Sequence, residues 1–230
     1  MSASPVAASA RSTVATFNIR HGLGLDGRVD LARTAGVLRG FGADVVALQE
    51  IDRYLDRSGG VDQVAEIERL SGYEVAFFPT VERGRSQYGI ALAASQPLDT
   101  AFLPLPRAGR EEPRGAVITS LNGITYLATH LSPSPQARVL QIGALAVWVR
   151  RSPGPLVVMG DLNATRRALD PLVDAGLARP GWRPLTSPAR LPRRQIDHIL
   201  AGKGATVTAR RKVRTAASDH LPVVALVAVG

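Results

Sequence analysis

The sequence predicts an α/β protein that folds as a single domain. Apolar runs rich in β-branched residues alternate with segments of helical periodicity from Ser12 to the C-terminus. No segment recurs at the period of roughly 20 to 50 residues that marks a repeat protein. A chain of 230 residues, 45% of them hydrophobic, is long enough to bury one full core. We therefore expect residues 12–230 to form one domain and residues 1–11 to be a disordered tail.

The expected elements follow from apolar runs, helical spacing and capping residues. Strands are predicted over residues 14–18, 45–49, 73–78, 89–94, 116–121, 124–130, 156–160, 196–200, 206–210 and 223–227. Helices are predicted over residues 31–39, with Asp30 as N-cap and Gly40 as the stop, over 62–70, and over 135–151, with Ser134 as N-cap. Surface loops are expected over residues 79–87, 104–115 and 179–195.

Composition narrows the kinds of site that the chain can build. There is no cysteine, so disulfides and thiolate metal sites are excluded, and any metal must bind to oxygen or imidazole ligands. The formal net charge is +9 and comes mostly from arginine, because Lys203 and Lys212 are the lysines of the chain. This charge favours polyanionic partners. The alternative is a genome rich in arginine codons, since the arginines are scattered along the sequence.

Localisation stays open at the level of sequence. No run reaches the roughly 18 uncharged apolar residues of a membrane span, because residues 142–149 are bounded by Gln141 and Arg150. The small residues at the N-terminus resemble those before a signal-peptidase site, but a charged n-region and an apolar h-region are missing. We expect a cytoplasmic protein as the sequence is written, and a secreted one if these residues remain from a trimmed leader. A monomer is expected in either case.

Two N-terminal strands lead into polar side chains that suit metal or phosphate chemistry. Asn18 ends the first predicted strand, in the segment Phe-Asn-Ile-Arg-His, which is weak evidence alone. Glu50 follows the buried strand 45–49, where its carboxylate is positioned to bind a hard cation at the C-terminal edge of a sheet. An ordinary strand-end carboxylate is the alternative for Glu50.

Two central strands repeat this design. His130 ends the strand 124–130, and the segment Gly160-Asp161-Leu162-Asn163 follows the strand 156–160. Gly160 lets the backbone turn closely, so that Asp161 and Asn163, two residues apart, point into one cavity. An Asx turn that caps the next helix is the alternative for this segment, and a hydrogen-bonded structural histidine is the alternative for His130.

Two Asp-His pairs lie near the C-terminus, Asp197-His198 and Asp219-His220. The second pair precedes a proline and a β-branched strand, which places the imidazole of His220 where it cannot continue a regular ladder, as in a reactive loop histidine. A structural histidine at a strand start is the alternative. Sheets of this class gather such strand ends along one rim where ligands bind, so a single site is the simplest explanation of all these residues.

These segments resemble, in order, the motifs of the endonuclease/exonuclease/phosphatase superfamily, which includes DNase I, exonuclease III and the neutral sphingomyelinases. The matching motifs run from Asn18 to His220 and read N-I-R-H, L-Q-E, T-H-L, G-D-L-N, I-D-H and S-D-H-L-P. The segment R-S-G-G-V-D-Q after Tyr54 resembles a compact bacterial branch. The resemblance implies a four-layer α/β/β/α sandwich of two packed mixed sheets flanked by helices. It also implies a hydrolase that cleaves phosphate esters at the rim of both sheets.

The resemblance further implies a divalent-metal site. Glu50 would be the central ligand of Mg²⁺, with Mn²⁺ as the alternative cation. Asn18 and Asp219 would complete or support the metal shell. Oxygen ligands suit both cations.

The catalytic roles implied by the resemblance centre on His220. This residue, oriented by Asp197, would act as general base or contact the phosphate, and Asp161 would position or deprotonate the attacking water. Asn163 would bind the phosphoryl oxygens, and His130 would assist on the phosphate or leaving-group side. Whether His220 or Asp161 takes the proton stays open. The set is coherent because phosphoryl chemistry depends on positioning and on neutralising negative charge.

One position departs from the family pattern. Many nuclease members carry a second acidic residue just before the fourth strand, where this chain reads Ser86-Gln87-Tyr88-Gly89. A second metal, or a phosphate contact like that of DNase I, is thereby put in doubt. Arg114, before the fifth predicted strand, falls where the family often has a phosphate-contacting arginine, and an ordinary exposed arginine is the alternative.

Nucleic acid is the favoured substrate, because the arginine-rich loops with Trp182 suit backbone contacts and base stacking. The alternative is a phosphodiesterase or phosphatase that acts on lipid headgroups or small phosphorylated molecules. Its lipid version requires an exposed apolar loop, which the arginine- and proline-rich loops do not obviously supply. A catalytically inactive binding module on the same fold is the second alternative.

Overall fold

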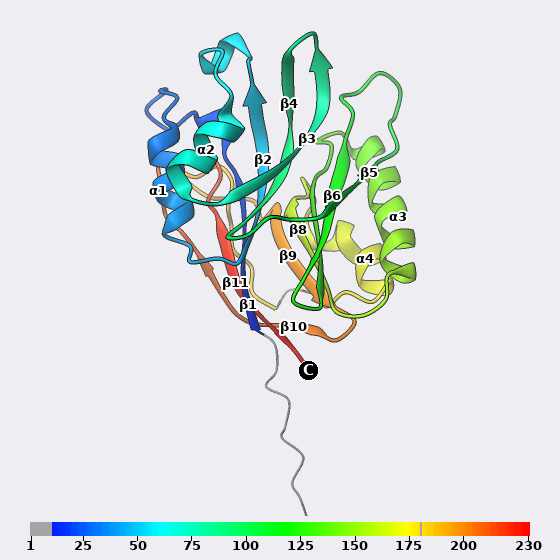
Figure 1. Ribbon diagram of the computed structural model, residues 1–230. Helices are drawn as coiled ribbons and strands as arrows, with labels where there is room; N and C mark the ends of the chain where they lie inside the picture. Colours follow the sequence, from blue (N-terminus) through cyan, green and yellow to red (C-terminus); the bar gives the residue numbers. More distant parts are fainter. Residues whose placement is uncertain (1–10, 180) are drawn as a thin grey trace, which may run out of the picture.

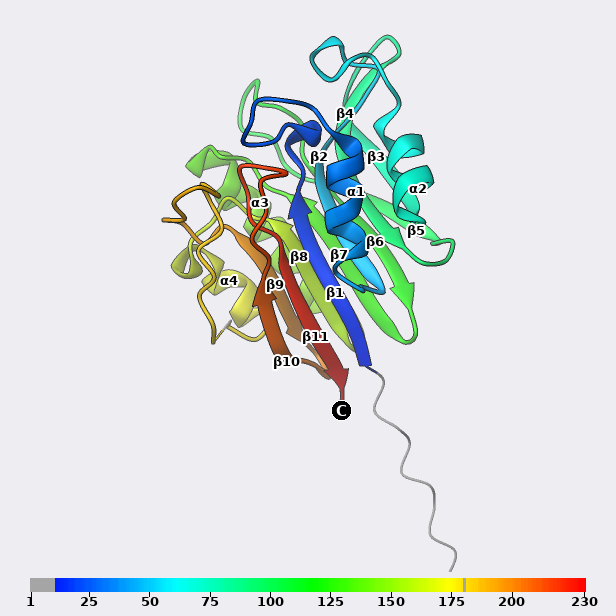
Figure 2. The ribbon, with the colours of Figure 1, turned by 90° about the vertical axis from the view of Figure 1, so that its left-hand side faces the viewer.

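The computed structural model describes residues 11–179 and 181–230 and shows four layers (Figure 1, Figure 2). Two sheets pack face to face in the centre. Helices α1 (Leu31–Arg39) and α2 (Gln63–Ser71) cover the outer face of one sheet, and α3 (Pro135–Arg151) and α4 (Asp170–Asp174) cover the outer face of the other. The predicted α/β/β/α sandwich is therefore confirmed.

The larger sheet has six strands in the order β10-β11-β1-β2-β4-β3. β1 and β2 run parallel, and the other neighbours are antiparallel. Because β1 and β2 are parallel, Asn18 and Gln49 are register partners near one edge of this sheet. The strands are β1 (Arg11–Asn18), β2 (Val45–Arg53), β3 (Glu74–Arg83), β4 (Ser86–Ala94), β10 (Ala205–Lys212) and β11 (Val223–Val229).

The smaller sheet has five strands in the order β5-β6-β7-β8-β9. β7 and β8 run parallel and are connected through α3, whereas the other neighbours are antiparallel. Their parallel direction brings the C-terminal residues of β7 and β8 to the same edge. The strands are β5 (Thr100–Pro104), β6 (Gly115–Leu121), β7 (Ile124–His130), β8 (Leu156–Asp161) and β9 (Asp197–Gly202).

Three apolar layers hold the sandwich together. The layer between the sheets contains Val14 and Val157, and the outer layers contain Leu38 on α1 and Leu145 on α3, all fully buried. Burying a side chain of this size contributes about 1.5 to 3 kcal/mol each. The core therefore fixes the two sheets relative to each other, and with them the strand ends at the common edge.

The three predicted helices are confirmed, and Asp30 and Ser134 occupy the predicted N-cap positions, but the side chain of Ser134 does not cap its helix. Asp30 accepts a hydrogen bond from the Arg33 backbone N–H at 2.8 Å, as expected of an N-cap. Ser134 forms no side-chain cap bond. Its hydroxyl interacts with Glu111 instead and helps to lower the pKa of that carboxyl. The short α4 escaped prediction because five residues show too little periodicity.

Three strand predictions need correction. Residues 79–87 form the end of β3, a turn at Gly84 with φ +59°, and the start of β4, so this segment is a hairpin and not a loop. β5 escaped prediction because it is a short edge strand with partly exposed side chains. β2 continues past residue 49 to Arg53. The loop predicted over 104–115 is confirmed for residues 105–114, because Pro104 ends β5 and Gly115 begins β6. The loop over 179–195 is confirmed, with residue 180 outside the described residues.

The predicted N-terminal tail lies almost entirely outside the residues that the structure describes. The predicted tail, residues 1–11, lies outside the described residues except for Arg11, which pairs with Ala228 as the first residue of β1. Within the described part of the chain, no helix is long and apolar enough to cross a membrane.

Candidate active site

Three neighbouring strands of the five-stranded sheet contribute one polar side chain each at the same level. His130 ends β7, Asp161 ends β8, and Asp197 begins β9. His130 is the register partner of Asp161 in the parallel pair, and Asp161 is the partner of Asp197 in the antiparallel pair. All three are buried. The ladder itself therefore sets these groups in a row along the edge of the sheet.

Gly160 permits close packing of β8 on β7 beside this row, a role that the sequence did not indicate. Its φ is +149°, and a Cβ atom at this position would lie 1.9 Å from the Thr129 carbonyl oxygen. Any side chain would push β8 away from β7 just before Asp161. The glycine thus keeps the row in register.

The six-stranded sheet contributes Asn18 and Glu50 from the facing side. Glu50 is not the last residue of a regular strand, which corrects the prediction, because it occupies a bulge in β2 with φ +60°. The bulge turns its carboxylate toward Asn18, whose Nδ2 donates to Glu50 Oε1 at 2.7 Å. The same Nδ2 donates to Asp161 Oδ2 at 3.1 Å. Asn18 therefore joins the edges of the two sheets.

A loop after β10 brings His220 into this arrangement. Its Nδ1 lies 3.0 and 3.1 Å from the two Asp197 oxygens and 3.7 Å from Asp161 Oδ2. Ser218 supports the loop, because its hydroxyl donates to the Asn18 carbonyl at 2.7 Å and accepts the His220 backbone N–H at 3.1 Å. The carboxylate of Asp197 thus contacts the Nδ1 side of the His220 imidazole.

Asn163 closes the row on the His130 side. Its backbone N–H donates to Asp161 Oδ1 at 3.0 Å, and its φ is +46°. Its Nδ2 donates to the Leu131 carbonyl at 2.9 Å and lies 3.3 Å from His130 Nε2. The segment is therefore an Asx turn, and this same turn brings the Asn163 amide to the site.

Burial and mutual charge govern the electrostatics of these groups. Burial raises the pKa of the Asp161 carboxyl to about 7, and the charge of Asp197 raises it further. Burial opposes charge on His220, but Asp197 outweighs it and raises the pKa of this imidazole to about 10. Burial also holds the pKa of His130 well below its usual range. The site therefore holds a cationic His220 and a neutral His130 near pH 7.

The oxygen ligands predicted for a metal fit a hard divalent cation in part. Burial raises the pKa of Glu50, and the charge of Asp219 raises it further, so a cation between these carboxylates would stabilise both charges. Asp219 is half-exposed and lies 3.6 Å from Arg20 Nε. The Asn18 side-chain oxygen accepts the Arg20 N–H at 3.0 Å, so Asn18 supports Glu50 more than it offers a free ligand atom.

A second set of metal-ligating atoms is present beside the first. Asp161, Asp197 and His220 each offer an atom, and these atoms lie within 4.8 Å of one another. His220 Nδ1 already contacts both Asp197 oxygens. The positive charge of His220 therefore balances the negative charge of Asp197 without a cation. Glu50 and Asp219 stay a prediction as metal ligands, because Asp161, Asp197 and His220 are the metal-ligating group that the described residues bring together.

Arg114 is buried, so the alternative of an ordinary exposed arginine is wrong, and its role as a phosphate contact stays a prediction. Its side chain is 9% exposed and pairs with Glu112 at 2.9 Å. Its charge is among the causes that lower the pKa of His130 and that act on Glu50. The positive charge of Arg114 therefore acts on two groups of the candidate site.

Two contributors escaped prediction by sequence. Ser218 is part of the S-D-H-L-P motif. The signal that could have identified it is its position two residues before His220, which is typical of a turn closed by a serine hydroxyl. Tyr88 lies in the segment Ser86-Gln87-Tyr88-Gly89, where this chain departs from the family pattern. Burial and the charge of Glu50 raise the pKa of its hydroxyl. Gln87 instead donates to Glu82 at 2.9 Å, away from the row.

Solved structures share this architecture. An endonuclease/exonuclease/phosphatase from Beutenbergia cavernae is 25% identical, with a TM-score of 0.78 over 96% of this chain and 72% of that one. A mannosyl-6-phosphatase from Bacteroides thetaiotaomicron is 18% identical, with a TM-score of 0.68 over 94% of this chain and 98% of that one. A humanized TDP2 from D. rerio is 15% identical, with a TM-score of 0.72 over 94% and 98%. No curated protein matches the chain.

The sequence comparison covers the whole row of site residues. A model described as the endonuclease/exonuclease/phosphatase family matches residues 15–220, from β1 to the Asp219-His220 pair. The strand order, the paired sheets and the polar strand ends agree with this match. The chain therefore belongs to the endonuclease/exonuclease/phosphatase family.

Proposed function

We propose that the chain hydrolyses phosphodiester bonds of nucleic acid with a bound divalent cation, Mg²⁺ in the first place. Its family supports phosphate-ester hydrolysis in general. The observation that carries the finer proposal is the convergence of Asp161, Asp197 and His220 within 4.8 Å, bridged to Glu50 through Asn18. A net charge of +9 supports a polyanionic substrate.

Asp161 is the group best supported for positioning the attacking water. One of its oxygens accepts the Asn163 backbone N–H and the other accepts Asn18 Nδ2, so the carboxylate is held in one orientation. A carboxylate held in this way can orient a water molecule for attack on phosphorus without reorganising first. It also accepts the proton of that water when the pKa matches the solution pH.

His220 is best supported as the contact to the phosphate. Asp197 occupies its Nδ1, which leaves Nε2 to donate to a phosphoryl oxygen. Asn163 and Arg114 add an amide and a guanidinium on the His130 side. These donors match the negative charge that builds up on the phosphoryl oxygens during transfer.

Glu50 and Asp219 would hold the cation. A bound divalent cation supplies Lewis-acid stabilisation of the phosphate oxygens and of the leaving group. Asn18 holds the Glu50 carboxylate in place through its 2.7 Å hydrogen bond.

A substrate panel tests the proposal. The full chain is assayed with Mg²⁺ and with excess chelator against plasmid DNA, single-stranded DNA, RNA, bis-para-nitrophenyl phosphate, sphingomyelin and phosphoinositides. We expect cleavage of at least one nucleic acid and of the synthetic diester, abolished by the chelator. Cleavage of a lipid without any nucleic acid contradicts the choice of substrate, and cleavage that persists in chelator contradicts the metal.

Lipid headgroups are the second candidate, because one observation now favours them. The loop over residues 179–195 exposes Trp182, Leu185 and Leu191, with Leu191 60% exposed, between several arginines. Exposed apolar side chains among basic residues are typical of a surface that binds anionic lipid. The loop therefore supplies the apolar feature that the sequence did not indicate, and the sphingomyelin and phosphoinositide arms test it.

A further inference from the structure

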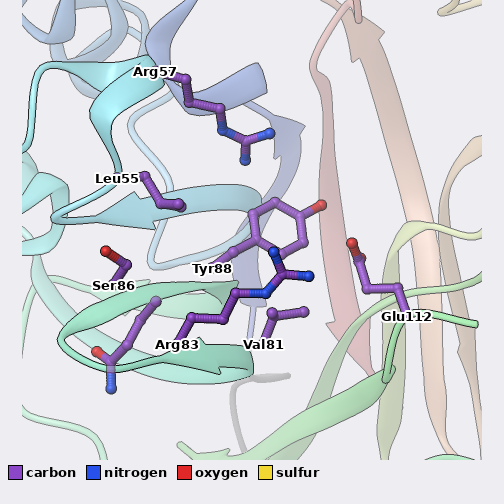
Figure 3. Close-up of a pocket in the computed structure, with 8 residues that line it drawn as sticks. Leu55, Arg57, Val81, Arg83, Ser86, Tyr88 and Glu112 are labelled. Atoms are coloured by element: carbon purple, nitrogen blue, oxygen red, sulfur yellow. The ribbon is translucent and has the colours of Figure 1, made fainter.

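A pocket of about 330 Å³ opens beside the candidate active site, on the side of the β3–β4 hairpin (Figure 3). Leu55 and Val81 line its apolar part, and Arg57, Arg83, Tyr88 and Glu112 line its polar part. Figure 3 shows Arg57, Arg83 and Tyr88 among the side chains that line this pocket. A volume in this range suits a small ligand or one residue of a polymer.

The two arginines of the pocket differ in how they are held. Arg57 donates to both oxygens of the buried Asp52, at 2.8 and 2.7 Å, and its Cζ lies 5.4 Å from the centroid of the Tyr88 ring. Arg57 is therefore a fixed group with donors left over. Arg83 ends β3 and is exposed, and among the described residues its guanidinium forms no ion pair.

The pocket shares a wall with the active site. Tyr88 lines the pocket, and its pKa responds to the charges of Glu50 and Arg114 on the other side. Glu112 lines the pocket as well and pairs with Arg114 at 2.9 Å. Tyr88 and Glu112 therefore belong to the lining of the pocket and also interact with charged groups of the candidate site.

The charges of the pocket leave one cation without a partner. Asp52 neutralises Arg57, and Arg114 neutralises Glu112, so Arg83 is the remaining charge. A guanidinium binds a phosphate through two parallel hydrogen bonds, and an aromatic ring beside it packs against a sugar or a base. Two donors and one ring around a single space are thus suited to a phosphorylated sugar.

We propose that this pocket binds a phosphate of the substrate other than the one that is hydrolysed, through Arg83 and Arg57, with the attached sugar or base on Tyr88. The inference rests on the proposed function, because it names what the same active site selects. A nucleic acid strand and a small bisphosphorylated sugar share this chemistry. Arg83 acts as a specificity-determining residue in either case.

A matched pair of substrates tests the inference. The dinucleotides d(pTpT) and d(TpT) differ by one terminal phosphate, and kcat/KM is measured for both with the full chain and Mg²⁺. We expect the wild type to prefer d(pTpT) by about tenfold, the value of one charge-assisted contact. Arg83→Gln should bring the ratio of the two kcat/KM values close to one, and Arg83→Lys should restore part of it.

Arg85→Gln is the control on the same hairpin. Arg85 lies over Tyr54, with its Cζ 5.2 Å from that ring centroid, and is not part of the pocket lining. The Arg85→Gln substitution removes one positive charge from the same hairpin, as Arg83→Gln does. Because it leaves the pocket lining unchanged, it should leave the preference for d(pTpT) intact. The inference is overturned if Arg83→Gln keeps that preference, if Arg85→Gln loses it equally, or if the wild type shows no preference.

Two further experiments distinguish a failure of this inference from a failure of the proposed function. Calorimetry of d(pTpT) binding in excess chelator should show a Kd about tenfold weaker for Arg83→Gln, and it decides the inference even if no substrate is cleaved. Absence of all cleavage would then count against the proposed function alone. The same kinetic comparison is made with a hexose bisphosphate and its monophosphate. The substrate pair whose kcat/KM ratio depends on Arg83 shows whether the pocket selects a nucleic acid strand or a phosphorylated sugar. An equal Kd for wild type and variant would refute the pocket.

Discussion

The two sheets contribute to the candidate site in different ways. The edge of the five-stranded sheet is regular, and His130, Asp161 and Asp197 occupy consecutive register positions with exposures of 4%, 2% and 1%. The edge of the six-stranded sheet is irregular, because Glu50 sits in a bulge and the β3–β4 hairpin exposes Arg83.

This contrast assigns different tasks to the two edges. A ladder sets groups at fixed spacings, which suits the positioning of reacting atoms. Bulges and exposed hairpins vary without disturbing the core, which suits recognition of cation and substrate. The regular edge should therefore carry the chemistry, and the irregular edge should carry selectivity.

The largest effect is expected at the regular edge and its histidine. Asp161→Ala and His220→Ala should each lower the turnover of bis-para-nitrophenyl phosphate at least about a hundredfold, because each removes a positioned charge. Circular dichroism of both variants checks that the fold persists. Near-wild-type rates in both would break the assignment of chemistry to this edge.

The regularity itself can be broken at Gly160. Gly160→Ala would place a Cβ atom 1.9 Å from the Thr129 carbonyl oxygen, and should lower the free energy of unfolding by about 2 kcal/mol. Gly143→Ala on α3 is the matched control, because a Cβ atom there meets nothing within 4 Å. That change should raise the stability by up to about 1 kcal/mol. Urea denaturation measures both, and equal effects would show that β7 and β8 tolerate separation.

At the irregular edge, Glu50→Gln tests the cation. We expect the Mg²⁺ concentration for half-maximal activity to rise about tenfold, because a charged ligand becomes neutral. Glu82→Gln, on β3 of the same sheet, should leave this concentration unchanged, because Glu82 contacts Gln87 and not the row. An unaltered metal titration for Glu50→Gln would remove this residue as principal ligand.

The smallest effect is expected where the two edges meet, at Ser218. Ser218→Ala loses the bonds to the Asn18 carbonyl and to the His220 N–H, and should lower kcat about fivefold with KM unchanged. Ser218→Thr keeps the hydroxyl and should restore kcat. A loss of unfolding free energy without any change in kcat would show that Ser218 is a structural residue only.

Much of the fold could be predicted from the sequence because its signals are local. α1 and α3 have the predicted bounds, since Asp30 and Pro135 mark where these helices begin. β5 and the β3–β4 hairpin could not be predicted, because edge strands lack the alternating burial that marks a strand. The order of the strands in each sheet depends on contacts between distant segments.

For the candidate site too, the local features could be predicted from the sequence and the long-range ones could not. The types and order of its polar residues were readable from Asn18 to His220, because each ends or begins an apolar strand. The roles of these residues stay predictions. Their geometry was not readable, since the hydrogen bond between Asn18 and Asp161 spans 143 positions.

The sequence alone determined the α/β class, the helices, the set of polar strand ends and the exclusion of thiolate metal sites. Tertiary structure alone decided that Glu50 lies in a bulge, that Arg114 is buried beside the row, and that Arg83 faces a pocket next to Tyr88. The physical reason is range. Propensity, capping and hydrophobic periodicity act within a few residues, whereas the bulge, the burial of a charge and the pocket result from two sheets packing on each other.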